Sequence, residues 1–149
     1  MQTTHIQADE RLGRRSRLRI VCPAYPAFNI YSRPAKLMTA LGPVCIATAV
    51  QDVPGWDAEV IDENNYRRGP KDAAGRPDHE AMQRARHADV VGLYGGLTST
   101  IPRLYEIAMR YKAMGVRTIA GGHHFVDENI EEALRNGIDV VVIGEGDRT

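Results

Sequence analysis

Short apolar runs alternate with longer polar or amphipathic segments along the chain from Leu18 onward. Each run spans five residues and is bounded by proline, glycine or polar residues, which is typical of strands buried in a parallel sheet. Five such strands are predicted, at residues 18–22 (LRIVC), 58–62 (AEVID), 90–94 (VVGLY), 116–120 (VRTIA) and 139–143 (DVVVI).

The segments between these runs carry helix signals. The clearest is residues 102–114, where apolar side chains recur at spacings of three and four and Gly115 follows as a left-handed cap. Pro43, Asp78 and Asp127 mark the starts of three others, the second of them reaching about Ala88. Strand and helix therefore alternate. This predicts an α/β fold, with a doubly wound parallel five-stranded sheet in the flavodoxin-like order 2-1-3-4-5 and helices on both faces.

The length and the termini suggest one domain taken from a longer protein. The 149 residues, 43% of them apolar, suffice for one core. We expect a flexible polar arm over residues 1–17 and a single domain over residues 18–149. The last residues, GEGDRT, leave no helix to cover the fifth strand, so we expect the parent chain to continue. Five arginines near the arm are expected to be solvated: Arg11, Arg14, Arg15, Arg17 and Arg19.

The charge balance and apolar content bear on partners and compartment. Nineteen basic and nineteen acidic residues cancel, so neither nucleic acid nor an anionic membrane is expected as a partner. No stretch approaches the ~20 apolar residues of a membrane span, and the N-terminus has no signal-peptide core. With only Cys22 and Cys45 present, we expect reduced thiols and a cytoplasmic location.

The strand order predicts where a ligand would bind. In such sheets the site lies outside the carboxyl ends of the strands, here between strands one and three. The loops 22–34 and 94–101 should build it, with help from 121–125 and 144–147. Glycines at these strand ends would let a bulky ligand approach the backbone. The candidate cofactor-binding residues are Tyr25, Tyr94, Gly95, Gly96, Thr98, Ser99, Gly121, Gly122, His123, Gly144, Glu145 and Gly146.

The loop after the third strand, YGGLTST, places three hydroxyls beside two glycines. Hydroxyls can hydrogen-bond a polar ligand group, although any one of Thr98, Ser99 and Thr100 could instead cap the helix that follows. The three together with the double glycine favour a binding site.

The histidines do not predict a metal site. His123 and His124 invite that interpretation, because imidazole is the commonest metal ligand. Adjacent residues on a strand point to opposite faces, however, and no other cluster in the sequence has ligand spacing. His5, His79 and His87 lie in polar stretches and are expected to be solvated.

No catalytic residues are predicted either. The sequence has no phosphate loop, and its GEGD segment lacks the third glycine and the following helix of a dinucleotide fingerprint. Cys22 stands beside Pro23 without an obvious activating cation. Asp62, which ends the second strand, could contact a ribose or cap a loop, and we favour the cap.

Three segments resemble a known family. Residues 89–100 (DVVGLYGGLTST) resemble the corresponding segment of cobalamin-binding domains such as that of methionine synthase, and residues 120–124 (AGGHH) resemble their next strand end. The closing VVVIGEGD resembles the GEGE ending of cobalamin-binding domains that precede a radical SAM barrel. The likeness runs from about Leu18 to the C-terminus.

The resemblance implies a corrinoid ligand, cobalamin, whose nucleotide tail enters between the strand-three and strand-four loops. Thr98 and Ser99 would lie near the tail, and Gly121 and Gly122 would line it. The Asp-x-His-x-x-Gly motif, which supplies a histidine ligand to cobalt, is missing from residues 23–34, so binding without a protein histidine is implied. The Cys-x-x-x-Cys-x-x-Cys motif is also missing. An iron–sulfur cluster and S-adenosylmethionine would therefore belong to a downstream radical SAM barrel, of the methyltransferase kind.

Two other functions stay open at this point. The same fold could be a non-corrinoid module that docks onto the barrel and shapes substrate access. It could also be a flavodoxin-like domain that binds a flavin or a nucleotide. Visible absorbance distinguishes a corrinoid from a flavin.

Overall fold

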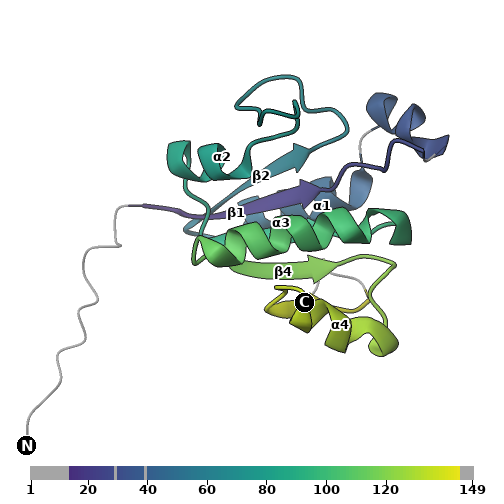
Figure 1. Ribbon diagram of the computed structural model, residues 1–149. Helices are drawn as coiled ribbons and strands as arrows, with labels where there is room; N and C mark the ends of the chain where they lie inside the picture. The colour runs from purple at the N-terminus through teal and green to yellow at the C-terminus, as the bar shows by residue number, and fades with distance from the viewer. Residues whose placement is uncertain (1–13, 29, 39, 145–149) are drawn as a thin grey trace, which may run out of the picture.

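The computed structural model describes residues 14–28, 30–38 and 40–144. Its strands form one parallel sheet in the order β2-β1-β3-β4-β5, so the predicted doubly wound α/β fold is confirmed. The carboxyl ends of the strands share one edge of the sheet, on the right in Figure 1. The strands are β1 (Ser16–Cys22), β2 (Trp56–Asp62), β3 (Val90–Tyr94), β4 (Arg117–Gly121) and β5 (Val140–Val142).

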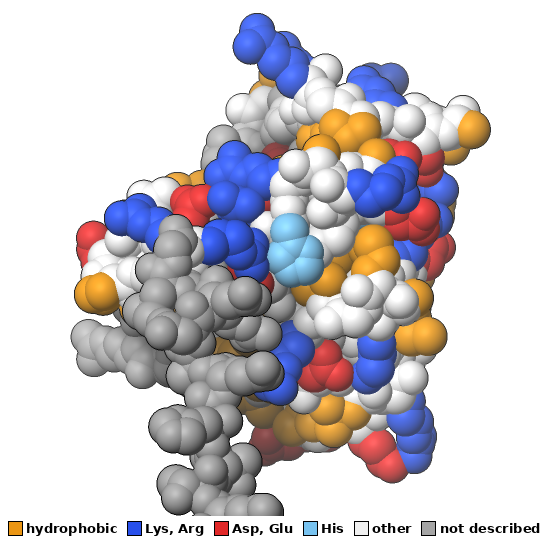
Figure 2. All heavy atoms as spheres, turned by 90° about the vertical axis from the view of Figure 1, so that its left-hand side faces the viewer, with side chains coloured by type: hydrophobic (Ala, Val, Ile, Leu, Met, Phe, Trp, Pro, Cys, Tyr) orange, Lys and Arg blue, Asp and Glu red, His pale blue; other side chains and the backbone are white. Residues whose placement is uncertain are grey.

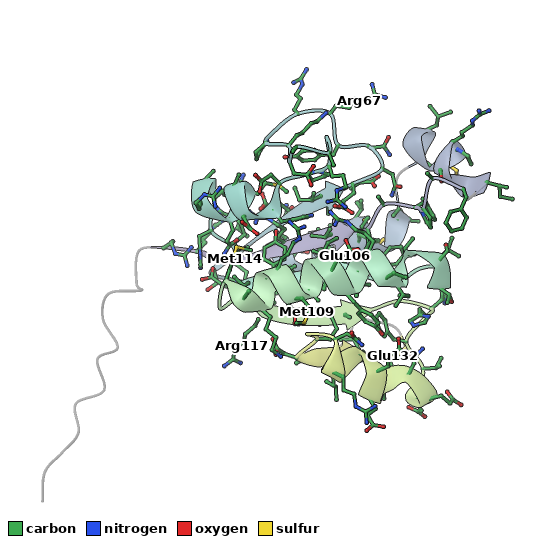
Figure 3. The ribbon with its side chains drawn as sticks, in the orientation of Figure 1. Arg67, Glu106, Met109, Met114, Arg117 and Glu132 are labelled. Carbon is green, nitrogen blue, oxygen red and sulfur yellow. The ribbon has the colours of Figure 1, made fainter. Side chains whose placement is uncertain are left out.

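Helices lie on both faces of the sheet, as the sequence predicts (Figure 1). Among the described residues, one face carries only α1 (Leu41–Gln51), which packs on β1 and β2. The other face carries α2 (His79–Ala85), α3 (Ile101–Ala113) and α4 (Ile130–Arg135). Met109, labelled in Figure 3, lies on the side of α3 that faces α4. No helix in the described ranges is both long enough and apolar enough to span a membrane.

Strand β1 runs through the middle of the core and is buried on both faces. Val21 belongs to the apolar cluster under α3, while its neighbour Ile20 belongs to the smaller cluster under α1. The apolar face predicted for α3 is confirmed, because Leu104, Ile107 and Tyr111 are fully buried there. The sheet is thus fixed from both sides at the strand that leads into the expected site.

Helix α2 is shorter than predicted because of one side chain. It begins after the Asp78 cap, as expected, but ends at Ala85 rather than Ala88. The Gln83 side chain accepts the Ala88 N–H (3.0 Å) and donates to the Ala88 C=O (2.9 Å). These two bonds satisfy the backbone of Ala88 outside the helix.

The last helix and the first strand also begin away from their predicted positions. A 3-10 turn (Asp127–Asn129) precedes α4, so the helix begins at Ile130 and the predicted Asp127 cap is wrong. The Asn129 side chain accepts the Val126 N–H (3.1 Å) within that turn. Strand β1 begins at Ser16, two residues earlier than predicted, where the Ser16 N–H donates to the Gly55 C=O (2.8 Å). That bond draws the end of the expected arm into the sheet.

The arginines of β1 are not solvated, which corrects the sequence prediction. Arg17 and Arg19 stand directly opposite Asp57 and Glu59 in the β1–β2 register. They bond these carboxylates at 3.0 and 2.7 Å, and Arg19 is only 1% exposed. The sequence did contain a signal for this pairing. The two arginines are two residues apart, and so are the two acids, so one register of neighbouring strands places each arginine beside an acid. Arg11, from the same run, lies outside the described residues.

Further ion pairs gather at the amino ends of the strands, where Figure 2 shows a concentration of Lys and Arg side chains. Arg14 pairs with Asp89 at 2.5 Å and is 56% exposed. Asp57 binds Arg86 (3.1 Å) in addition to its partner on β1. His87 is 56% exposed, as expected, and its Nε2 lies 3.6 Å from Asp89. The acidic groups of this edge are thus engaged in structural pairing.

His79 is fully buried, so the expectation that it is solvated is wrong. Its Nδ1 lies 3.1 Å from the Tyr111 hydroxyl, and its Nε2 lies 3.1 Å from the Glu63 carboxylate. The layer between the sheet and α2 is built from polar partners, so a search for apolar periodicity could not detect it. His5 lies outside the described residues.

Candidate functional site

A pocket of about 250 Å³ opens at the carboxyl edge of the sheet, between the ends of β1, β2 and β3. This is the switch point that the strand order predicts, because β1 and β3 lead to helices on opposite faces. Each of the three strand ends contributes to the walls. These include Cys22, Tyr25, Asp62, Asn64, Tyr94 and Leu97.

The predicted site residues divide between this pocket and the neighbouring loops. Tyr25, Tyr94 and Gly96 line the pocket. Glu145 and Gly146 lie outside the described residues. The other candidates belong to the loop after β3 or to the ends of β4 and β5, and they do not line the pocket: Gly95, Thr98, Ser99, Gly121, Gly122, His123 and Gly144.

Asp62 and Asn64 line the pocket although the sequence prediction left them out of the site. Asp62 is the predicted cap, since its carboxylate oxygens accept the Asn64 N–H (2.9 Å) and the Asn65 side-chain amide (2.8 Å). Asn64 accepts the Tyr25 N–H (2.9 Å) and donates to the Pro23 C=O (3.3 Å). It therefore ties the loop after β2 to the loop after β1. The Asp-x-Asn sequence at the end of the second strand could have indicated this turn, because Asp and Asn side chains commonly bond to backbone groups in turns.

Cys22 lines the pocket without being a reactive thiol. Burial raises its pKa to about 12, and the negative charges of Asp62 and Glu63 act in the same direction. The neutral thiol is a small apolar part of the wall rather than a nucleophile or a metal ligand. Cys45, on α1, is exposed.

Gly95 and Gly122 are required by the packing of two loops against each other. The backbone of Gly95 donates to the Gly121 C=O (2.8 Å) and accepts the His124 N–H (2.9 Å). Gly122 has φ +119°, and a Cβ there would lie 2.7 Å from the Gly95 carbonyl oxygen. Gly121 differs, because a Cβ there would meet only Val142, at 3.5 Å. Of Gly121 and Gly122, therefore, only Gly121 could accept a side chain without displacing backbone.

Thr98, His124 and Asn129 form a hydrogen-bonded series beside β4. Asn129 Oδ1 accepts the Val126 N–H (3.1 Å), so its Nδ2 is the atom that faces His124 Nε2, at 3.3 Å. His124 Nε2 is then the acceptor, and Nδ1 carries the proton that reaches Thr98 Oγ1 at 3.2 Å. This arrangement leaves the Thr98 hydroxyl proton available to a ligand acceptor and occupies both ring nitrogens of His124.

Metal-ligating side chains do not converge in the described ranges of the chain, where no group of three or more His, Cys, Asp or Glu could hold an ion. His123 is exposed at the end of β4. The described residues of the site therefore offer hydrogen-bond donors and acceptors and apolar surface.

The segment between β1 and α1, residues 23–40, carries unusual apolar exposure. Phe28, Ile30, Leu37 and Met38 are between 66% and 89% exposed. Met38 also lines the pocket, and Figure 1 shows the segment beyond the carboxyl edge of the sheet. Large apolar side chains exposed within one short segment favour a surface that binds a ligand or a partner. We call these four side chains the apolar rim.

The comparison with protein families bears directly on this edge of the sheet. The family model of the B12 binding domain matches residues 32–149, which include the ends of β2 and β3 and the second half of the apolar rim. The chain belongs to the B12 binding domain family. The match leaves out β1 and the loop that carries Tyr25, so those residues are placed in the site by the fold alone.

Solved structures of related shape have low sequence identity to this B12 binding domain. A novel cobalamin-binding protein from Desulfitobacterium hafniense DCB-2 is 18% identical, with a TM-score of 0.48 over 87% of this chain and 53% of that one. The domain therefore spans about half of that protein. A conserved protein from Enterococcus faecalis V583 is 12% identical, with a TM-score of 0.44 over 90% of this chain and 94% of that one. A comparison with curated proteins finds no match.

Proposed function

We propose that this B12 binding domain binds cobalamin at the carboxyl edge of its sheet. The observation that carries the proposal is the apolar rim beside the pocket, in a chain that matches the family over residues 32–149. A large, partly hydrocarbon ligand explains why Phe28 and Leu37 stand in solvent at 89% and 86% exposure. A small polar ligand would leave that surface unexplained.

The residues present fit such a ligand. The apolar rim offers hydrocarbon contact, Thr98 offers a hydroxyl donor, and Gly121 offers backbone without a side chain, in ordinary contact with Val142 at 3.5 Å. Cobalamin supplies a cobalt ion that can carry a methyl group. The role of this domain would be to carry the corrin: it would hold the ring at the strand ends and leave the other face of the ring accessible to a second domain.

Cobalt would have no protein nitrogen as a ligand in this proposal. The loop from Pro23 to Pro34 contains no histidine, and both ring nitrogens of His124 are engaged. Electron paramagnetic resonance of the cob(II)alamin form tests this directly. We expect a base-off signal without nitrogen superhyperfine splitting, and a split signal would contradict it.

The wider context is a further part of the proposal. We place the domain, which begins at Ser16 with β1 and follows an N-terminal arm, in a cytoplasmic radical SAM enzyme of the methyltransferase kind, because VVVIGEGD resembles the ending that precedes such barrels. The gene tests this, since a Cys-x-x-x-Cys-x-x-Cys motif should be encoded beyond Thr149. A gene that ends there, or continues without the motif, would contradict it.

Ligand retention tests the central proposal. The purified domain is mixed with hydroxocobalamin and desalted, and we expect a corrinoid spectrum to remain. A variant with Phe28→Ser and Leu37→Ser should retain less, while Met109→Ser, which changes a 52% exposed side chain on α3, should retain as much as the wild type. No retention at high micromolar ligand would favour the non-corrinoid module. A flavin spectrum in the protein as purified would favour the flavodoxin-like alternative.

A further inference from the structure

A buried carboxylate outside the pocket holds the loop that forms its wall. The Glu63 side chain is 1% exposed and follows Asp62 directly at the end of β2. Its Oε2 accepts the Ala24 N–H at 2.9 Å. Ala24 lies between Pro23 and Tyr25, both of which line the pocket.

Glu63 is also bonded to two helices. Arg103 donates to both carboxylate oxygens, at 2.7 and 3.1 Å, and His79 Nε2 lies 3.1 Å from Oε1. Arg103 lies in the first turn of α3, just after the loop that follows β3, and donates in turn to Glu106 (2.8 Å), labelled in Figure 3. The carboxylate thus joins the loop after β1 to the start of α3.

These bonds keep Glu63 ionised in spite of its burial. Burial alone raises the pKa of a carboxyl group, but the bonds from His79, Arg103 and the Ala24 N–H lower it to about 2. Hydrogen bonds to a buried charge are the stronger kind, and an unpaired charge there would be costly. The attachment of Ala24 is therefore firm, and the adjacent bond from Tyr25 N–H to Asn64 reinforces it.

We propose that Glu63 is a positioning residue of the pocket. It does not line the pocket, yet it fixes the distance between two walls, the loop Pro23–Tyr25 and the loop after β3 that leads into α3. Corrinoid affinity then depends on Glu63 without contact between them. The part that concerns affinity rests on the proposed function, whereas the part that concerns the loop does not.

The same buried layer offers a matched control in Glu59. Its carboxylate accepts from Arg19 Nε (2.7 Å), and Arg19 reaches the Tyr111 hydroxyl (3.2 Å), which also contacts His79. Glu59 is therefore a second arginine-bound acid of this polar layer, with a 19% exposed side chain. It belongs to the middle of β2 and makes no bond to the pocket loop among the described residues.

The experiment compares Glu63→Gln with Glu59→Gln. Amide hydrogen exchange measured by NMR reports the loop through Ala24 and Tyr25, with the core amide of Val91 as the reference for global opening. We expect exchange at the two loop amides to rise about tenfold relative to Val91 in Glu63→Gln, and to stay within about twofold in Glu59→Gln. Titration with hydroxocobalamin should show about tenfold weaker binding for Glu63→Gln alone.

The exchange rates test the positioning role of Glu63, and the titration tests its effect on corrinoid affinity. Equal loop exchange in the two variants would overturn the positioning role. Faster loop exchange with unchanged corrinoid affinity would overturn the link to binding. A wild type that binds no corrinoid contradicts the proposed function, while the exchange data still decide the role of Glu63. If Glu63→Gln does not fold, Glu63→Asp, which keeps the charge but shortens the reach to Ala24, is measured in its place with the same expected ranking.

Discussion

Glu63 makes the stability of the domain sensitive to acid. Its pKa is lowered from an ordinary 4.5 to about 2 by its bonds to His79 and Arg103. A carboxyl group with a lowered pKa in the folded state stabilises the fold above its unfolded-state value, and this contribution is lost as the pH falls through the folded value. The contribution is about 3 kcal/mol at neutral pH, and it disappears between about pH 5 and pH 2.

Urea unfolding at pH 7 and pH 3.5 measures this dependence. We expect the wild type to lose about 1 kcal/mol more than Glu63→Gln between the two conditions, since the amide does not titrate. Equal losses in the two proteins would mean that Glu63 does not carry the acid sensitivity.

The two glycines that end β4 should respond differently to substitution. Gly122→Ala places a Cβ 2.7 Å from a backbone oxygen at φ +119°, so we expect a loss of about 1–3 kcal/mol in unfolding free energy. Gly121→Ala meets only Val142, at its Cβ and its carbonyl oxygen, both at an ordinary contact distance of 3.5 Å, and should leave stability within about 0.5 kcal/mol. Gly121→Ala is therefore the variant in which lost cobalamin retention can be assigned to the ligand.

Thr98 should matter more for binding than the histidine that contacts it. Thr98→Val removes the hydroxyl donor, and we expect about 5- to 150-fold weaker corrinoid binding, the cost of an unsatisfied buried partner. His124→Ala removes the bond at 3.2 Å that orients Thr98 but leaves the hydroxyl in place, so the loss should be smaller. Absorbance titration of both variants compares them, and the reverse order would place the ligand nearer to β4.

At the scale of elements, the apolar strands and α3 could be predicted because their side chains follow simple periods. Leu104 and Tyr111 lie on the predicted buried side of α3, and Gly115 adopts the expected positive φ of 74°. Polar layers obey no such period. His79 and Arg19 are buried because partners on distant elements satisfy them, and those partners can be identified only once the strand register is known.

The candidate site could be predicted to the correct edge of the sheet but not to all of its residues. The strand order alone placed Tyr25 and Tyr94 near the switch point, and both line the pocket. Asp62 and Asn64 line it too, because β2 ends level with β1, which only the register reveals. The glycines were predicted for ligand access, whereas Gly95 and Gly122 are explained by loop packing.

The pairing of β1 with β2 should depend on Arg19 more than on Arg17. Arg19→Ala removes the 2.7 Å partner of the partly buried Glu59 and one of the two partners of the buried Tyr111 hydroxyl, which keep Arg86 (3.5 Å) and His79 (3.1 Å). We expect a loss of about 3 kcal/mol in unfolding free energy. Arg17 has a 20% exposed side chain, and Arg17→Ala should cost about 1 kcal/mol or less. Denaturant titration of the two variants makes the comparison, and equal losses would contradict it.

At the scale of the whole molecule, the amino and carboxyl ends of the strands differ in the side chains that they carry. The amino edge is held by ion pairs such as Arg14 with Asp89 and Arg86 with Asp57. The carboxyl edge has the pocket and the apolar rim. The ion pairs of the amino edge thus lie away from the surface where a partly apolar ligand would bind, whereas the pair of Glu63 with Arg103 (2.7 Å) holds a wall of the pocket.

The two faces of the sheet should also differ in how freely their sequences can change. Under α1 the contacts are apolar, among Ile20, Ala47 and Ala58, and apolar packing accepts replacements of similar volume. Under α2, Arg19 and His79 each have particular partners, so nearly any replacement there leaves a buried group unsatisfied. A library of random variants selected for folding would therefore be diverse along α1 and nearly invariant along the polar layer.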